Sequence, residues 1–285
     1  MNFQSKKSIL KIYLLLALAA GIALAVWRAV LLKEHCNPYD MSFQDGVLPT
    51  LEAFEYTLLA VLALLSTSAI FVSKTRFGLF GARASTTSIA ICALCGFMLA
   101  AVGTLAMLCF PDEIFDFYDE TLKSYHGFLL ATVAFMLISA LYFLGRASTA
   151  LKNSPSVSAL SLALPCFAML YLVSSYFNPE RPLLDFNRVT SEIAFICVLM
   201  FMLSEARLAI GEGSYPFRFA ASLITIVAVC SYILPLLLLA AFWEMDMSLA
   251  LLSECSLVPI LFYATFAAFN AIRTLEPKED EPKAE

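Results

Sequence analysis

Residues 219–242 read FAASLITIVAVCSYILPLLLLAAF, a run in which no side chain carries a charge. A helix needs about 20 mostly apolar residues to cross the hydrocarbon core of a bilayer, so this stretch is long enough to span a membrane. Seven other stretches have the same character. The eight predicted transmembrane helices cover residues 9–32, 51–73, 88–110, 127–146, 158–177, 190–210, 219–242 and 248–272.

The composition of the whole chain supports this interpretation. Of its 285 residues, 61% are apolar and 14% are charged, whereas a typical soluble domain is about 25% charged. A soluble globular enzyme, a disordered chain and a collagen-like fibre are thereby excluded. The predicted fold class is all-α, a polytopic membrane protein with a single integral membrane domain over residues 1–285 and an acidic cytoplasmic tail at 273–285. The loops between the predicted spans are too short to hold a soluble output domain.

The first predicted helix has some features of a signal peptide. Its start is basic, at Lys6, Lys7 and Lys11, and Ala23 and Ala25 form a small-residue pattern that resembles a cleavage site. The apolar run nevertheless continues to Leu32, which is longer than the 7–15 residues of an ordinary signal segment. We therefore expect an uncleaved first helix, with cleavage as the alternative.

The distribution of basic residues predicts the orientation. Lys and Arg favour cytoplasmic loops. With eight spans and a cytoplasmic N-terminus, thirteen of the 18 basic residues fall on the inner side. The five on the outer side are Arg28, Lys33, Lys123, Arg181 and Arg188. The sequence thus predicts a protein of the cell (plasma or inner) membrane with both termini in the cytoplasm.

The net charge of −5 reflects an acidic outer surface and an acidic tail. It gives no sign of a nucleic-acid partner, which would require a basic patch. The expected surroundings are the lipid bilayer, with a membrane protein partner or further copies of this chain as additional contacts.

The two halves of the sequence resemble each other weakly. Asn37-Pro38 follows the first predicted helix and Asn178-Pro179 follows the fifth, and a glutamate lies near the start of the next helix in each case. Two parallel four-helix repeats would produce this pattern. Chance is the alternative, because Asn-Pro is a common turn pair.

Prolines do not follow the same symmetry. Pro165, Pro235 and Pro259 lie in the fifth, seventh and eighth predicted helices, and the first four helices contain none. Transporters built on matched discontinuous helices show breaks at corresponding places in both halves. The sequence therefore argues against that class of transporter.

Glu254 is the strongest candidate for a functional residue. It lies about seven residues into the last predicted helix, roughly 10 Å from its outer end at about 1.5 Å per residue. A carboxylate at that depth must pair, reach water or stay protonated. Ser253 and Ser256 flank it. One hypothesis is a cation, amine or proton site that opens outward, and the other is a structural hydrogen bond to a neighbouring helix.

Three further charged residues share the predicted outer layer and complete the candidate ligand- or ion-binding set: Arg28, Glu55 and Glu192. Arg28 would neutralise a carboxylate there, or it would extend to the membrane interface. The two glutamates also suit the positive end of the helix dipole, which is the simpler explanation of their positions. At the inner side, we expect Glu205 to pair with a base of an inner loop.

Loop 111–126 is acidic and aromatic, and it predicts an interfacial helix, with a lid over an outer cavity as the sharper alternative. Cys92 and Cys95 form a C-x-x-C pair that indicates close helix packing, together with Gly96 and Gly103. Whether Cys36 and Cys109 form a disulfide at the outer face stays open, because spacing alone does not show their separation.

The motifs of common enzymes and cofactor sites are missing from the sequence. The two histidines, His35 and His126, lie in predicted outer loops, which leaves no histidine pair for a haem within the spans. There is no H-E-x-x-H, G-x-S-x-G, P-loop or G-x-G-x-x-G pattern. We therefore predict no catalytic residues, no metal and no cofactor, and an enzyme is disfavoured. No named family is recognisable from these residues.

Two functions remain. The first is a small-molecule or ion permease, or a ligand-binding membrane protein, with an outward-facing acidic site around Glu254. The alternative is a non-catalytic accessory or sensory membrane subunit that works through a protein partner. A water-accessible cavity at the acidic residues would favour the first, and a closely packed interior would favour the second.

Overall fold

The computed structural model describes residues 3–36, 43, 46–72, 76–77, 86–111, 123–148, 154–178, 186–242, 249–273 and 275–276. Its helices are α1 (Phe3–His35), α2 (Leu48–Ser66), α3 (Ser68–Val72), α4 (Thr86–Cys109), α6 (Lys123–Ala147), α7 (Pro155–Leu160), α8 (Ala163–Phe177), α9 (Phe186–Ala209), α10 (Tyr215–Phe242), α11 (Leu249–Glu254) and α12 (Leu257–Arg273). Two short strands, β1 (Arg76–Phe77) and β2 (Leu275–Glu276), pair antiparallel.

The predicted all-α membrane fold is confirmed. Eight helical segments of the described residues are long and apolar enough to cross a membrane, and each overlaps one of the predicted spans. They run over Lys7–His35, Leu48–Ile70, Thr86–Cys109, Ser124–Ala147, Pro155–Phe177, Phe186–Ala209, Tyr215–Ala241 and Leu252–Arg273. The division into two four-helix repeats stays a prediction.

Six of the spans form a closed ring. Following the main contacts, α4 packs against α6, α6 against α8, α8 against α9, α9 against α10, α10 against α12, and α12 against α4 again. Aromatic side chains fill the interior of this ring. Tyr171 of α8 stacks on Phe195 of α9 with ring centroids 3.6 Å apart, and Tyr263 of α12 makes an edge contact with Phe143 of α6 at 4.8 Å.

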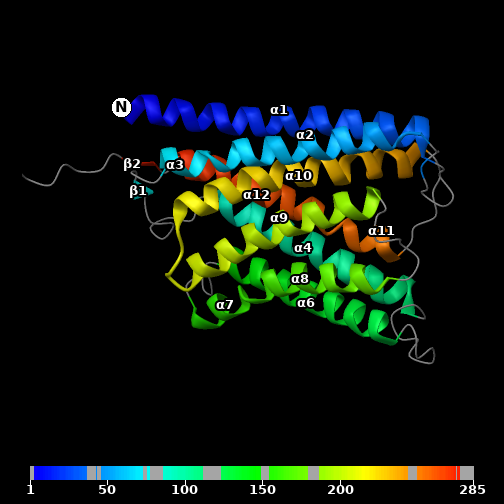
Figure 1. Cartoon of the computed structure of the whole chain (residues 1–285). Helices are drawn as coiled ribbons and strands as arrows, with labels where there is room; N and C mark the ends of the chain where they lie inside the picture. Colours follow the sequence, from blue (N-terminus) through cyan, green and yellow to red (C-terminus); the bar gives the residue numbers. More distant parts are fainter. Residues whose placement is uncertain are drawn as a thin grey trace, which may run out of the picture.

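Helices α1 and α2 form a separate layer outside the ring, against α10 (Figure 1). Helix α10 is therefore the member of the ring that makes most of the contact with this layer. In its most apolar window 78% of residues are buried, against 28% for α1 and 22% for α2. The stretch that identifies the chain as a membrane protein is thus also the centre of its packing.

Two predicted spans are not continuous helices, which corrects the prediction for 158–177 and 248–272. A turn at Ser161–Leu162 separates α7 from α8, and a turn at Cys255–Ser256 separates α11 from α12. Each turn begins four residues before a proline, Pro165 or Pro259. Proline has no N–H to donate to the carbonyl four residues earlier. The residue before each proline bonds to that carbonyl instead, Leu164 N to Ser161 O at 3.3 Å and Val258 N to Cys255 O at 3.1 Å.

Glycines bring α4 and α6 close together, as the small residues of α4 predicted. A Cβ built on Gly96 would lie 2.7 Å from Leu144 Cγ, and one on Gly103 would lie 2.7 Å from Leu137 Cδ2. At these two positions any larger side chain would force the facing leucine side chain of α6 to shift. The two glycines therefore allow the close contact between α4 and α6.

The two ends of the bundle are distinct in Figure 1. The N-terminus, β1 and β2 lie at one end, and α11 lies toward the other. Because β1 belongs to a predicted inner loop and β2 follows the last span, their pairing places two predicted inner segments together. Most of the predicted interfacial helix at 111–126 and most of the tail 273–285 lie outside the described residues.

Candidate functional site

Glu254 is the last residue of α11 and lies directly before the turn that separates α11 from α12. Its side chain is 1% exposed. The hydroxyl of Tyr171, on α8, donates a hydrogen bond of 2.9 Å to its Oε1. The break caused by Pro259 therefore ends α11 at a buried carboxylate that is held from the opposite side of the helix ring.

The backbone at this turn is tightly wound. Cys255 N bonds to Leu252 O and Ser256 N to Ser253 O, both at 3.1 Å, in the three-residue spacing of a 3₁₀ turn. Ser253 and Ser256 are almost fully buried, and neither hydroxyl has a hydrogen-bond partner among the described residues. Unpartnered polar groups are rare in protein interiors, so these two hydroxyls have free capacity to bond a water, an ion or a ligand.

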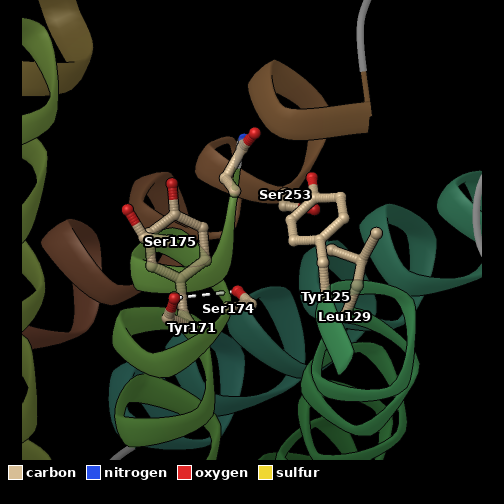
Figure 2. A pocket seen from close by; sticks show the side chains of 7 residues that line it. Tyr125, Leu129, Tyr171, Ser174, Ser175 and Ser253 are labelled. Carbon is tan, nitrogen blue, oxygen red and sulfur yellow. Dashed lines mark hydrogen bonds between the residues drawn. The ribbon is translucent and has the colours of Figure 1, made fainter. Parts of the chain in front are cut away.

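A small pocket is lined in part by Tyr171, the partner of Glu254, and Figure 2 shows the side chains around it. Its volume is about 20 Å³, which is enough for about one water molecule. Side chains of α6, α8 and α11 line it, together with the residue that follows α8: Tyr125, Leu129, Tyr171, Ser174, Ser175, Asn178 and Ser253.

Two of the hydroxyls that line this pocket have no protein partner in the described part of the chain. Ser175 is 7% exposed and Ser253 is 1% exposed, and both are unsatisfied. Ser174 instead bonds back to the Tyr171 carbonyl at 2.8 Å, the bond drawn in Figure 2. The pocket therefore combines space for a water molecule with hydroxyls that need one.

The second predicted site residue, Arg28, lies elsewhere. It is fully buried on α1 and donates from Nη1 to Tyr232 O at 2.6 Å and from Nη2 to Asn187 Oδ1 at 2.9 Å. Its guanidinium also lies 4.5 Å from the centroid of the Tyr232 ring. The alternative in which Arg28 extends to the interface does not fit this position. Arg28 instead joins α1 to α9 and α10.

The two other predicted site residues also have local roles. Glu192 accepts a hydrogen bond of 2.8 Å from Arg188 Nε, one turn earlier on α9. Glu55 is half-buried on α2, whose main packing partners are α1, α3 and α10. Helix α11, which ends in Glu254, packs instead against α4. The four predicted residues therefore do not form one cluster around Glu254.

A second polar cluster surrounds Glu205, near the end of α9. Arg218 of α10 donates from Nε to Glu205 Oε1, and the Tyr263 hydroxyl donates to Glu205 Oε2 at 2.9 Å. Arg146 and Tyr142 of α6 lie within electrostatic range of the same carboxylate. The predicted pairing of Glu205 with a base is confirmed, but the base, Arg218, lies in the first turn of α10 and not in a loop. Its position on the inner side stays a prediction.

Tyr171, Tyr125 and Ser175 were not among the predicted site residues. Single tyrosines and serines in an apolar span carry little signal, because most of them bond to their own helix. The adjacent Ser174 and Ser175, nine and ten residues after Pro165, are the signal that could have pointed to this helix end. The link from this helix to Glu254 is the hydrogen bond from Tyr171, which the sequence does not reveal.

The described residues contain no group of three or more His, Cys, Asp or Glu that could hold a metal ion.

The prediction that both histidines lie in loops is wrong. His35 ends α1, and His126 is buried near the start of α6. Cys36 and Cys109 are not joined to each other; Cys36 is buried and Cys109 is exposed.

No family model matches the chain, and searches of curated proteins and of solved structures give no significant match.

Proposed function

We propose that this multi-pass membrane protein is an ion permease whose binding site is built on Glu254 and opens outward. One observation carries the proposal: a buried carboxylate ends a broken helix next to a pocket lined by unsatisfied hydroxyls. Ionisable groups inside membrane spans are costly and are retained mainly where they bind or move ions. Irregular backbone at membrane depth likewise occurs where it lines a cavity.

The size of the pocket limits the substrate. A volume of about 20 Å³ admits a species no larger than water. A small organic solute would need a more open state of the same site. An ion is therefore the substrate class that this conformation supports best.

The proposal includes an orientation. The protein lies in the plasma or inner membrane of the cell, with both termini in the cytoplasm. The pocket beside Glu254 then lies toward the outer face. Thirteen of 18 basic residues on the predicted inner side support this. The pairing of β1 with β2, at the end of the bundle that also holds the N-terminus, agrees with it.

Thiol labelling tests whether an aqueous path reaches the site. The eight native cysteines are replaced, and Ser253→Cys and Ser256→Cys are made separately in that background. Intact cells are then treated with a small, membrane-impermeant thiol reagent. Both serines are buried and unpartnered, but only Ser253 lines the pocket, so Ser256→Cys is a matched control. We expect labelling at position 253 and none at 256. Labelling at neither position, with a labelled outer-loop control, contradicts an outward-opening site.

A second candidate function is favoured by the close packing of the ring. Aromatic side chains occupy its interior, where Tyr171 stacks on Phe195 and Tyr263 packs on Phe143. A permease needs a route across this interior. An accessory or sensory subunit that works through a membrane partner, or through a second copy of itself, would need no route. The mass of the complex extracted in native lipid discs tests this alternative. A fixed second subunit, together with no labelling at position 253, would favour it over the permease.

A further inference from the structure

We infer that the ion exchanged at this site is the proton, and that Tyr171 relays it between Glu254 and a water molecule in the pocket. This inference rests on the proposed function and specifies its substrate. It depends on three connected features. Tyr171 lines a pocket of water size, and its hydroxyl donates a hydrogen bond to the carboxylate of Glu254.

The position of the carboxylate favours a proton over a metal cation. Glu254 does not line the pocket, and the polar side chains that do are all neutral hydroxyls and one amide. Bound metal cations such as Ca²⁺ and Mg²⁺ take about six to eight oxygen ligands, usually with carboxylates in direct contact. One water-sized space without a charged ligand does not provide this. A proton needs only a continuous series of hydrogen-bonding groups.

Tyr171 provides the link in that series. It lines the pocket, and its hydroxyl donates to Glu254 Oε1 at 2.9 Å. A tyrosine hydroxyl has one proton to donate and lone pairs that accept. It can therefore receive a proton from one neighbour while it donates its own to another. The stacking of its ring on Phe195 fixes the direction in which the hydroxyl points.

The unsatisfied serines indicate where the water lies. A buried water needs about two to four polar partners. The Ser175 and Ser253 hydroxyls both line the pocket and lack protein partners among the described residues. They come from α8 and α11, on either side of the space. A water between them satisfies both and lies in the same pocket as Tyr171.

The transfer balances without any other reactant. A hydronium ion in the pocket gives one proton to Tyr171 Oη, and its O–H bond breaks as a new one forms on the tyrosine. The original Tyr171 O–H bond breaks, and that proton forms an O–H bond with Glu254 Oε1. The products are a neutral water, a neutral tyrosine and a neutral carboxylic acid. Release to the outer side is the reverse sequence.

The other titratable groups near the site have separate positions. Tyr125 and His126 lie on α6, Cys255 follows Glu254 on the chain, and α4 carries no charged residue. On α9, the carboxylate of Glu192 is paired with Arg188. The second buried carboxylate, Glu205, has both oxygens engaged by Arg218 and Tyr263. Glu254 is therefore the carboxyl group that exchanges a proton with the pocket through Tyr171.

Infrared difference spectroscopy on the full-length protein in lipid discs tests this inference. Stepping the pH of the bathing buffer should produce the carbonyl band of a carboxyl group that gains and loses a proton. We expect Glu254→Gln to abolish the band and Glu52→Gln, at an exposed position of α2, to retain it. Where Glu254→Gln does not fold, Glu254→Asp serves instead, and a shift in the band position identifies the residue.

The role of Tyr171 is tested by the rate at which this band shifts after a change from H₂O to D₂O. A positioned proton-transfer group contributes roughly 10²–10⁴-fold to a rate, so Tyr171→Phe should slow the exchange by at least about tenfold. Tyr176→Phe, at an exposed tyrosine of the same helix, is the matched control. An unchanged exchange rate in Tyr171→Phe overturns the relay.

The result also separates this inference from the proposed function. Labelling at Ser253→Cys together with a band that responds to Na⁺ or K⁺, and not to pH, retains the permease and overturns the proton. A band that follows pH while position 253 is never labelled retains the protonation of Glu254 and contradicts the open outward path.

Discussion

Arg28 shows how a charge is held inside this bundle. Its guanidinium is fully buried and reaches two acceptors on two other helices, the Asn187 side chain and the Tyr232 carbonyl. The Tyr232 carbonyl lies three residues before Pro235, in the turn of α10 where proline removes one backbone hydrogen bond. Neighbouring side chains commonly satisfy such weakened turns in membranes. The arginine thus stabilises α10 as well as anchoring α1.

We predict that Arg28→Gln lowers the free energy of unfolding. A glutamine is too short to reach both acceptors, and a buried acceptor left without its donor costs about 1–3 kcal/mol. Reversible unfolding in mixed detergent measures the change. Lys33→Gln, at an exposed position of the same helix, is the control and should have almost no effect. Equal stability of the two variants would contradict a structural role for Arg28.

In the cluster around Glu205, we expect the loss of Glu205 and the loss of Arg218 to lower the free energy of unfolding by different amounts. Glu205→Gln removes the carboxylate that interacts with both Arg218 and Arg146, whereas Arg218→Gln leaves Glu205 with its interaction with Arg146 and its hydrogen bond from Tyr263. Removal of one partner of a buried ion pair costs about 3–5 kcal/mol. We therefore expect Glu205→Gln to be the more destabilising variant.

A double-mutant cycle checks this asymmetry. The free energy lost in Glu205→Gln combined with Arg218→Gln should be smaller than the sum of the two single losses, because no uncompensated pair remains. Additive losses would show that the two side chains do not interact in the membrane.

At the scale of helices, the close packing of α4 against α6 depends on the glycines of α4. Gly96→Val would place its side chain against Leu144 and the Ala140 carbonyl. Overpacking of this kind typically costs about 1–3 kcal/mol. Gly127→Val is the matched control, because a Cβ at that position on α6 meets nothing within 4 Å. We expect a lower unfolding temperature for the first variant only, and similar temperatures would contradict the close packing.

Helix positions and helix breaks differ in how far the sequence predicts them. The spans follow from hydropathy, because bilayer thickness imposes a length of about 20 residues on every one of them. The breaks do not follow from proline alone. Pro165 and Pro259 each follow a turn, whereas α10 continues through Pro235. Near Pro235 the Arg28 guanidinium, from another part of the chain, donates to the Tyr232 carbonyl. Proline position alone therefore does not predict where a helix breaks.

The candidate site was predictable in part for the same reason. Glu254 stood out because a carboxylate in an apolar run is costly wherever the run packs. Its partner Tyr171 lies 83 positions earlier, and only the arrangement of the ring brings the two together. Arg28, Glu55 and Glu192 share the predicted outer layer with Glu254, but depth in the membrane does not specify which helices are neighbours.

At the scale of the whole molecule, the β1–β2 pairing connects the second loop to the end of the last span. Arg76 lies opposite Glu276 in this register, and directly opposed Cα atoms of antiparallel strands are about 4.5–5.5 Å apart. Disulfides suit this separation. In a cysteine-free background, Arg76→Cys combined with Glu276→Cys should form a disulfide on mild oxidation, detected by mass spectrometry.

The same pair tests the orientation. Its reduced thiols should be protected from an impermeant reagent in intact cells and accessible after permeabilisation. Glu52→Cys combined with Glu276→Cys, which joins opposite ends of the bundle, should form no disulfide. Labelling of the Arg76→Cys and Glu276→Cys thiols in intact cells would reverse the proposed topology.

The contact between Arg28 and Tyr232 has a consequence for how the protein is made. The two residues are 204 positions apart, and ribosomes add about 5–20 residues per second, so roughly 10–40 s separate their synthesis. During that interval the first helix is already emerging into the bilayer, while the helix that will accept its guanidinium does not yet exist. The nascent chain must therefore keep a charged side chain near the lipid head groups or the insertion machinery until α10 arrives. The packing of α1 and α2 onto the ring of six helices is consequently a late event, which occurs after nearly the whole chain has been translated.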